Sequence, residues 1–200
     1  ALFNLNPATN ADMHNVAVGH ASGFAMTTGR NNTLVGSNSG NALTTANSNT
    51  AVGLQALSTD TKGDNSVAIG ENALLTQNFT TSTDSYNTAV GSNAGRAVTT
   101  GLYNTLIGGL AGDALTDADF NVAVGQNALT VDTLGSKSTA IGAAALNVQN
   151  FTTATDSHNT AVGYSAGSAV TTGVENTLIG SLAGDAITTG NENTALGKSA

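Results

Sequence analysis

The amino-acid sequence predicts an all-β protein, a parallel β-roll or β-solenoid of about eleven coils, because one short motif recurs along almost the whole chain. The motif is Asn or Ser, one further residue, two apolar residues and Gly, as in residues 87–91. Its glycine occurs at Gly19, Gly36, Gly53, Gly70, Gly91, Gly108, Gly125, Gly142, Gly163, Gly180 and Gly197. Successive glycines are 17, 17, 17 and 21 residues apart, and the series then repeats as a 72-residue super-repeat. Such a short, fixed period is typical of a solenoid in which each coil contacts only its neighbours.

The repeat also defines the domain organisation. Residues 15–200 form the β-roll repeat domain, and residues 1–14 fit no coil and are expected to be an N-terminal cap or junction. Each 21-residue step carries four extra residues, within the matching stretches 77–81 and 149–153. The sequence stops inside a repeat, so we expect the repeat domain to continue beyond residue 200 in a longer parent protein.

The composition argues against several classes of protein. Aromatic residues make up 4% and charged residues 9% of the chain, both low for a globular enzyme. The net charge of −8 disfavours nucleic acid as a partner, because phosphate binding needs clustered Lys and Arg. The absence of cysteine excludes disulfides and thiolate metal sites. No apolar run approaches the roughly 20 residues of a membrane-spanning helix, so we expect no membrane insertion.

Two adjacent apolar columns run through the motif. The first holds Ala or Leu, such as Ala89, and the second holds Val, Ile or Leu. Neighbouring strand residues point to opposite faces, so the pattern predicts a sheet buried on both faces, inside the coil and against another copy of the chain. The residues that best represent the structural repeat are Asn87, Val90, Gly91, Asn104, Ile107, Gly108, Asn159, Val162 and Gly163.

The rest of each coil predicts a thin interior and tight corners. Some coils carry Gly then an aliphatic residue, such as Gly95 with Val98, and others carry Leu then a polar residue, such as Leu74 with Gln77. We interpret this alternation as one packing space filled from either of two positions. A second corner, represented by Gly101, is expected to adopt positive φ, and each coil is expected to have two short strands. For the recurring Asn column, an amide ladder that satisfies turn backbone is favoured over a ligand-binding ladder.

Candidate chemical groups are few. The histidines are His14, His20 and His158, and Tyr86 stands in the place of His158 one super-repeat earlier. A position so freely replaced does not fit a catalytic base, so we expect a non-enzymatic protein without a cofactor. An acidic group with calcium-ligand chemistry lies at Asp113, Asp117 and Asp119, for which a solvated acidic corner is favoured over a metal site.

Five aromatic residues are the candidate surface contacts. Three lie on successive coils along a variable ridge and two lie in the four-residue insertions: Tyr86, Tyr103, Phe120, Phe79 and Phe151. Aromatic rings on an exposed ridge suit glycan or receptor contact. The alternative, which we favour, is that they pack against a neighbouring subunit or an adjacent turn.

The repeat resembles two known families. Residues 65–70 (NSVAIG) resemble the repeat of the head domains of trimeric autotransporter adhesins. Residues 87–95 (NTAVGSNAG) followed by 104–108 (NTLIG) more closely resemble repeat regions of bacteriophage tail fibres. The resemblance covers residues 15–197 and implies a left-handed roll assembled as a homotrimer with two further copies of itself.

The tail-fibre resemblance implies a structural or adhesive fibre segment of the virion that extends or forms the host-attachment apparatus. A host cell-surface glycan or protein receptor is then a candidate partner. The first alternative is the head of a bacterial trimeric surface adhesin, located extracellularly on the cell surface. A less favoured alternative is an ice-binding solenoid with threonine rows such as Thr33, Thr50, Thr88 and Thr105. This threonine column is expected to share a face with the Val/Ile column, which argues against ice binding.

Overall fold

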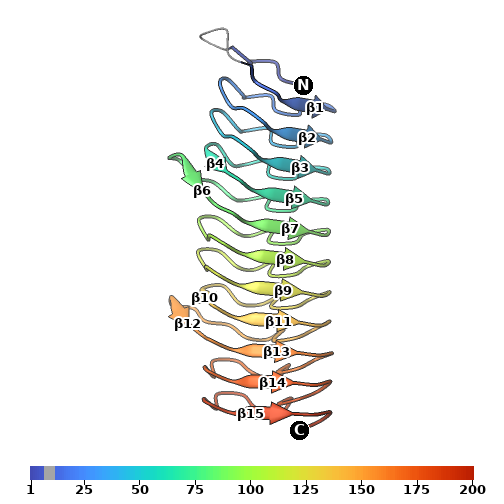
Figure 1. The fold of residues 1–200 in the computed structure, drawn as a ribbon, viewed down its shortest axis with the longest axis vertical. Helices are drawn as coiled ribbons and strands as arrows, with labels where there is room; N and C mark the ends of the chain where they lie inside the picture. Colours follow the sequence, from blue (N-terminus) through green and yellow to red (C-terminus); the bar gives the residue numbers. More distant parts are fainter. Residues whose placement is uncertain (7–11) are drawn as a thin grey trace.

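The computed structural model describes residues 1–6 and 12–200, and it confirms an all-β parallel solenoid of about eleven coils (Figure 1). The coils stack into a rod whose chain ends lie at opposite ends. One three-residue strand per coil forms a continuous 11-stranded sheet. These strands are β1 (Val16–Val18), β2 (Thr33–Val35), β3 (Thr50–Val52), β5 (Val67–Ile69), β7 (Thr88–Val90), β8 (Thr105–Ile107), β9 (Val122–Val124), β11 (Thr139–Ile141), β13 (Thr160–Val162), β14 (Thr177–Ile179) and β15 (Thr194–Leu196). Within the described residues, no helix is long and apolar enough to cross a membrane.

The long sheet pairs equivalent motif positions in register. Between β7 and β8, for example, Thr88 is opposite Thr105 and Val90 is opposite Ile107. Each column of the sequence therefore becomes a straight column of side chains along the rod. With neighbouring strands roughly 4.8 Å apart, eleven coils give a rod of about 50 Å.

The motif glycine is required for two independent reasons, shown here at Gly91. Its φ is +139°, a conformation that side-chain-bearing residues rarely adopt. A Cβ at this position would also lie 2.5 Å from the carbonyl oxygen of Gly108 in the next coil. The glycine column therefore permits the backbone of each coil to lie directly on the next.

The interior of the solenoid is filled as the alternating pattern predicts. Leu74, Val98 and Leu106 are fully buried. A Cβ on Gly95 would meet Leu106 Cδ1 at 2.7 Å and Leu74 Cδ2 at 3.0 Å, so neighbouring leucines already occupy the space above this glycine. The prediction of one packing space filled from two positions is confirmed. Leu74 nevertheless adopts a left-handed φ of 48°, close to the 57° of Gly95, which the sequence pattern does not reveal.

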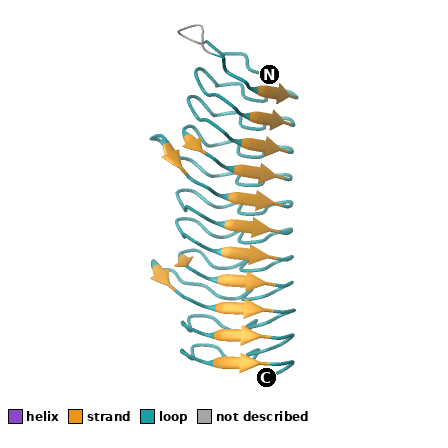
Figure 2. Cartoon of the chain, in the orientation of Figure 1, coloured by secondary structure: helices purple, strands orange, loops and turns teal. Residues whose placement is uncertain are grey.

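The prediction of two strands in every coil is wrong. Within residues 1–6 and 12–200, a second strand pair forms only beside the insertions, where β4 (Gly63–Asp64) pairs with β6 (Thr83–Asp84) and β10 (Gly135–Ser136) pairs with β12 (Thr155–Asp156) (Figure 2). Elsewhere the corresponding segment bends. Thr99 and Gly101 both donate their backbone N–H to the carbonyl oxygen of Thr116, at 2.9 and 3.3 Å. This convergence on one acceptor requires a curved backbone that cannot continue as a ladder.

The second corner also differs from the expectation. Gly101 does not have a positive φ, and the left-handed residue is Tyr103, two positions later, with φ of 59°. Gly101 is needed for a different reason, since a Cβ there would lie 2.4 Å from the carbonyl oxygen of Ala118. The equivalent of Tyr103 is left-handed in the other coils too, although none of these residues is glycine.

The N-terminal segment lies against the first coil. Leu2 and Leu5 pack on the hydrophobic core, and the ring of Phe3 stacks on that of Phe24 with centroids 5.4 Å apart. Residues 1–6 thus pack on the first coil. Residues 7–11, which belong to the predicted cap or junction of residues 1–14, lie outside the described part of the chain.

We expect Gly91→Ala to lower the free energy of unfolding by at least about 1–3 kcal/mol, the cost of forcing a side chain into this φ, with the collision against Gly108 adding to it. Gly109→Ala is the matched control, because its Cβ would have no neighbour closer than 4.0 Å and its φ is not positive. Chemical denaturation followed by circular dichroism measures both variants. Equal stability of the two variants would contradict the role assigned to the motif glycine.

Candidate functional site: the outer face of the long sheet

The outer face of the 11-stranded sheet carries the main unpartnered surface of the described chain. In each strand the middle residue points into the coil, as Ala89 does with 0% exposure, and its two neighbours point outward. The outward apolar column is substantially exposed, with Ile107 at 39%, Val18 at 58% and Leu196 at 76%. The inner burial predicted from the sequence is confirmed, whereas a single chain leaves the outer face uncovered.

This outer face consists of two parallel columns. One holds mainly Thr, with Val16, Val67 and Val122 as substitutes, and the other holds Val, Ile or Leu. Neighbouring members are roughly 4.8 Å apart along the rod, and the two columns lie about 7 Å apart along the strands. Neither column contains a titratable side chain. The face therefore presents a column made up mainly of threonine hydroxyl groups beside a column of aliphatic side chains.

The recurring Asn column supports this face from within, as an amide ladder. Asn87 Oδ1 accepts the backbone N–H of Asn104 at 2.9 Å, and Asn87 Nδ2 donates to the carbonyl oxygen of Gly101 at 2.7 Å. Asn104 makes the same two contacts with Asn121 and Ala118. Both amides are buried, with 0–1% exposure. The predicted amide ladder is confirmed, and it fixes the register of the strands.

A buried polar network anchors each four-residue insertion. Asp60, with 0% exposure, accepts the backbone N–H groups of Gly63 and Phe79, both at 3.0 Å, and Nε2 of Gln77 at 2.6 Å. Gln77 Oε1 in turn accepts Nδ2 of Asn87 at 2.9 Å. Asp132 and Gln149 repeat these contacts one super-repeat later. The sequence pattern marks Gln77 only as the polar residue that accompanies Leu74. The signal that could have revealed the network is that Gln77 and Gln149 each begin a stretch that contains an insertion.

The insertions bury their aromatic rings, which contradicts the surface-contact interpretation of Phe79 and Phe151 and agrees with the favoured interpretation of packing against an adjacent turn. Phe79 and Phe151 are each only 6% exposed, so both rings are withdrawn from the surface. The ring of Phe79 lies beside Gly63, where an added Cβ would come within 2.8 Å of its Cδ2. The exposed residues of the first insertion are instead hydroxyl-bearing, Thr80 and Thr81. The two phenylalanines therefore hold the loops down and make no outside contact of their own.

The ridge aromatics form a stack along the rod. Tyr86, Tyr103 and Phe120 are 52%, 43% and 52% exposed. Ring centroids are 5.7 Å apart between the two tyrosines and 4.8 Å apart between Tyr103 and Phe120, with nearly parallel planes. The favoured interpretation, packing against an adjacent turn, is thus confirmed. Because each ring covers the face of the next, the stack presents mainly ring edges, and sugar stacking on the inner faces is blocked.

The remaining candidate groups are dispersed. His14, His20 and His158 are all exposed. The three aspartates of the acidic group each bind a different partner: Asp113 accepts the hydroxyl of Thr130, Asp117 that of Thr100, and Asp119 the backbone N–H of Leu102. Across residues 1–6 and 12–200, no group of three or more His, Cys, Asp or Glu residues is placed to hold a metal ion.

Comparisons with family models, curated proteins and solved structures find no match. The features that bear on function are therefore those of the chain itself. The largest of them is the uncovered outer face of the long sheet.

We expect Asp60→Asn to destabilise the protein by about 1–3 kcal/mol, because the amide group turns a donor toward Gln77 Nε2, which is itself a donor. Asp185→Asn is the control, since Asp185 is exposed and its carboxylate accepts no hydrogen bond from the described residues. Asp132→Asn should reproduce the loss in the second super-repeat. Thermal unfolding of the three variants measures the effect, and an Asp60→Asn protein as stable as the control would refute the network's structural role.

Proposed function

We propose that this chain is a non-enzymatic segment of a trimeric surface fibre, of the kind that its sequence resembles in phage tail fibres. In that setting it extends or forms the host-attachment apparatus of a virion. The observation that carries the proposal is the outer face of the long sheet, where one apolar residue per coil is exposed or half-buried along the rod.

The physical basis is the free energy of burying this stripe. Apolar surface removed from water contributes roughly 25 cal/mol per Å². Soluble monomers rarely leave contiguous apolar patches larger than a few hundred Å² uncovered. Here every coil adds one Val, Ile or Leu to the same stripe, so the gain from association grows with the length of the rod. Self-association of parallel copies pairs this stripe with an identical one in matching register. The expectation of three copies comes from the resemblance to phage tail fibres and trimeric adhesins.

A trimer of this kind suits a spacer in an attachment fibre. Parallel strand pairing and the amide ladder both join each coil to the next along the rod. Each chain therefore resists bending. Three parallel rods that share an apolar axis present the outer turns three times at each level. Weak contacts to a host-cell glycan or protein receptor would then add by avidity without a deep pocket.

The uncovered outer face is also compatible with two alternative functions. The head of a bacterial trimeric surface adhesin would use the same face for assembly. Ice binding would use the threonine column of the uncovered outer face, to which Thr33 and Thr177 belong, but the Val/Ile column shares that face and argues against it. That function requires the face to remain free in solution, so the association state separates it from both fibre proposals.

We expect light scattering after size exclusion to give three times the 19.7 kDa mass of one chain. Replacing Val90 and Ile107 together by Asp should yield folded monomers, because the buried stripe would then carry charge. Val131→Asp, at a residue 41% exposed and outside the strands, should remain trimeric. A monomeric unmodified chain would overturn the trimer, and thermal hysteresis of such a monomer would identify ice binding instead.

A further inference from the structure

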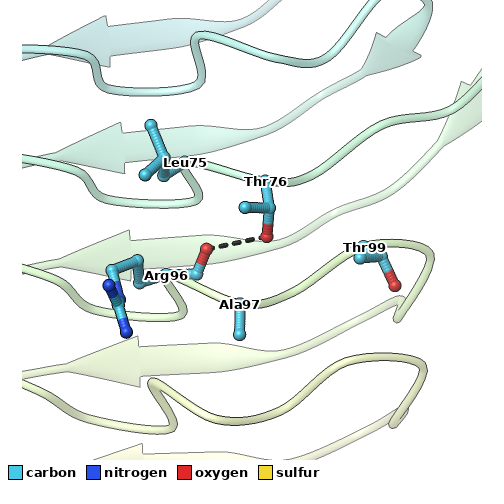
Figure 3. A pocket seen from close by; sticks show the side chains of 5 residues that line it. All are labelled: Leu75, Thr76, Arg96, Ala97 and Thr99. Carbon is cyan, nitrogen blue, oxygen red and sulfur yellow. Dashed lines mark hydrogen bonds between the residues drawn. The ribbon is translucent and has the colours of Figure 1, made fainter.

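A hollow of about 390 Å³ lies between two adjacent coils, the last of the first super-repeat and the first of the second (Figure 3). It is lined by Leu75 and Thr76 of one coil and by Arg96, Ala97 and Thr99 of the next. Its lining is mainly apolar, with one guanidinium group among the side chains. The molecule is acidic and has only five Lys and Arg residues, so an apolar surface beside a cation distinguishes this hollow from most of the protein surface.

The hollow faces away from the proposed subunit interface. None of its five lining residues belongs to a strand of the long sheet. The adjoining residues Leu74 and Val98 are fully buried in the core, so the coil interior lies between the hollow and the sheet. A ligand in the hollow therefore does not compete with association through the outer sheet face.

Arg96 is available to an anionic ligand. Its residue is exposed, and the ion pair found among the described residues joins Lys137 to Asp156 and leaves Arg96 out. The neighbouring carboxylate in the same column is Asp113, one coil further along, and its Oδ1 accepts the hydroxyl of Thr130. Guanidinium groups bind carboxylates through two parallel hydrogen bonds, which a free Arg96 can supply.

The hydroxyl groups of the hollow are oriented by the backbone. Thr76 Oγ1 donates its hydrogen to the carbonyl oxygen of Arg96 at 2.8 Å, a contact drawn in Figure 3. Thr99 Oγ1 donates to the carbonyl oxygen of Thr116 at 3.2 Å. Since both hydrogens are engaged within the chain, each oxygen can take part in a further hydrogen bond only as an acceptor. They suit partners that donate O–H groups.

From these contacts we propose that the hollow binds a sugar ring that carries a carboxylate, a uronic-acid-type residue of a surface glycan. Leu75 and Ala97 take the apolar C–H face of the ring, and Arg96 pairs with the carboxylate. Thr76 and Thr99 accept hydrogen bonds from ring hydroxyls. Because the site is open, it covers only one face of the sugar, and we expect a dissociation constant of about 1 mM. An assembly of several chains presents several copies of the site, which raises the avidity.

The equivalent pair of coils 72 residues later provides a comparison within the same chain. There Asn147 replaces Leu75, Val148 replaces Thr76 and Ser168 replaces Arg96, whereas Ala169 and Thr171 match Ala97 and Thr99. Three of the five lining residues therefore change, among them the cation and one of the two hydroxyl groups. This contrast places the binding site at the junction of the first and second super-repeats and not at the equivalent junction.

The test is titration of the whole chain with methyl glucuronide and, in parallel, with methyl glucoside, followed by saturation-transfer NMR. We expect binding of the glucuronide to be at least tenfold tighter than that of the neutral sugar. Leu75→Asn with Arg96→Ser should abolish this preference. Adding Asn147→Leu, Val148→Thr and Ser168→Arg to that double variant should restore it at the transplanted site.

Asp113→Asn gives a second, independent measurement. Removing the carboxylate one coil from Arg96 should tighten glucuronide binding by about two- to fivefold, a gain that misfolding would not produce. Equal binding of the two sugars, no binding of either, or unchanged binding by the Leu75→Asn/Arg96→Ser variant would each overturn the proposal. Light scattering of the same samples reports the association state separately, so loss of sugar binding in an intact trimer and binding by a monomer are distinguishable results.

Discussion

The close stacking of backbone on backbone at the motif glycine is the constraint on which the rest of this molecule depends. Gly91 lies so near the carbonyl group of Gly108 that no side chain fits between them, and its neighbours along the rod repeat this approach. Stacking at this distance places every motif position directly above its equivalent. The amide ladder, the aromatic stack and the outer apolar stripe all follow, because each is a set of identical or similar side chains held at one spacing.

The constraint also explains why the two kinds of coil alternate. The interior is thin, and a leucine in one coil fills the space that a neighbouring glycine leaves open, as Leu106 does above Gly95. Leu74 occupies such a position with a left-handed backbone that costs about 1–2 kcal/mol for a residue with a side chain. Its full burial offsets that cost, since burying a leucine contributes about 1.5–3 kcal/mol. Strain and packing therefore compensate within a single residue.

How much could be predicted from the sequence depended on whether a feature repeats. The sheet, its register and the buried Ala/Leu column recur in every coil, so eleven aligned copies reveal them. Features set by one pair of neighbouring coils were missed or wrong. The burial of Phe79 depends on the network around Asp60, and the missing second strand depends on two N–H groups sharing the carbonyl of Thr116. The packing of Tyr103 on an adjacent turn is predicted from the sequence, whereas the parallel stacking of the rings is not, because periodicity contains no ring orientations.

The same distinction separates the two proposed uses of the surface. An interface between copies of one chain has to match at every level, and the outer sheet face varies little, holding Thr or Val in one column and Val, Ile or Leu in the other. A site for an outside ligand needs no such repetition, and the hollow at Leu75 and Arg96 occurs where the two super-repeats diverge. Because the coil interior lies between them, residues of the hollow can change without disturbing the stripe. A solenoid of this kind can therefore keep one face constant for assembly while the opposite turns acquire separate ligand chemistry.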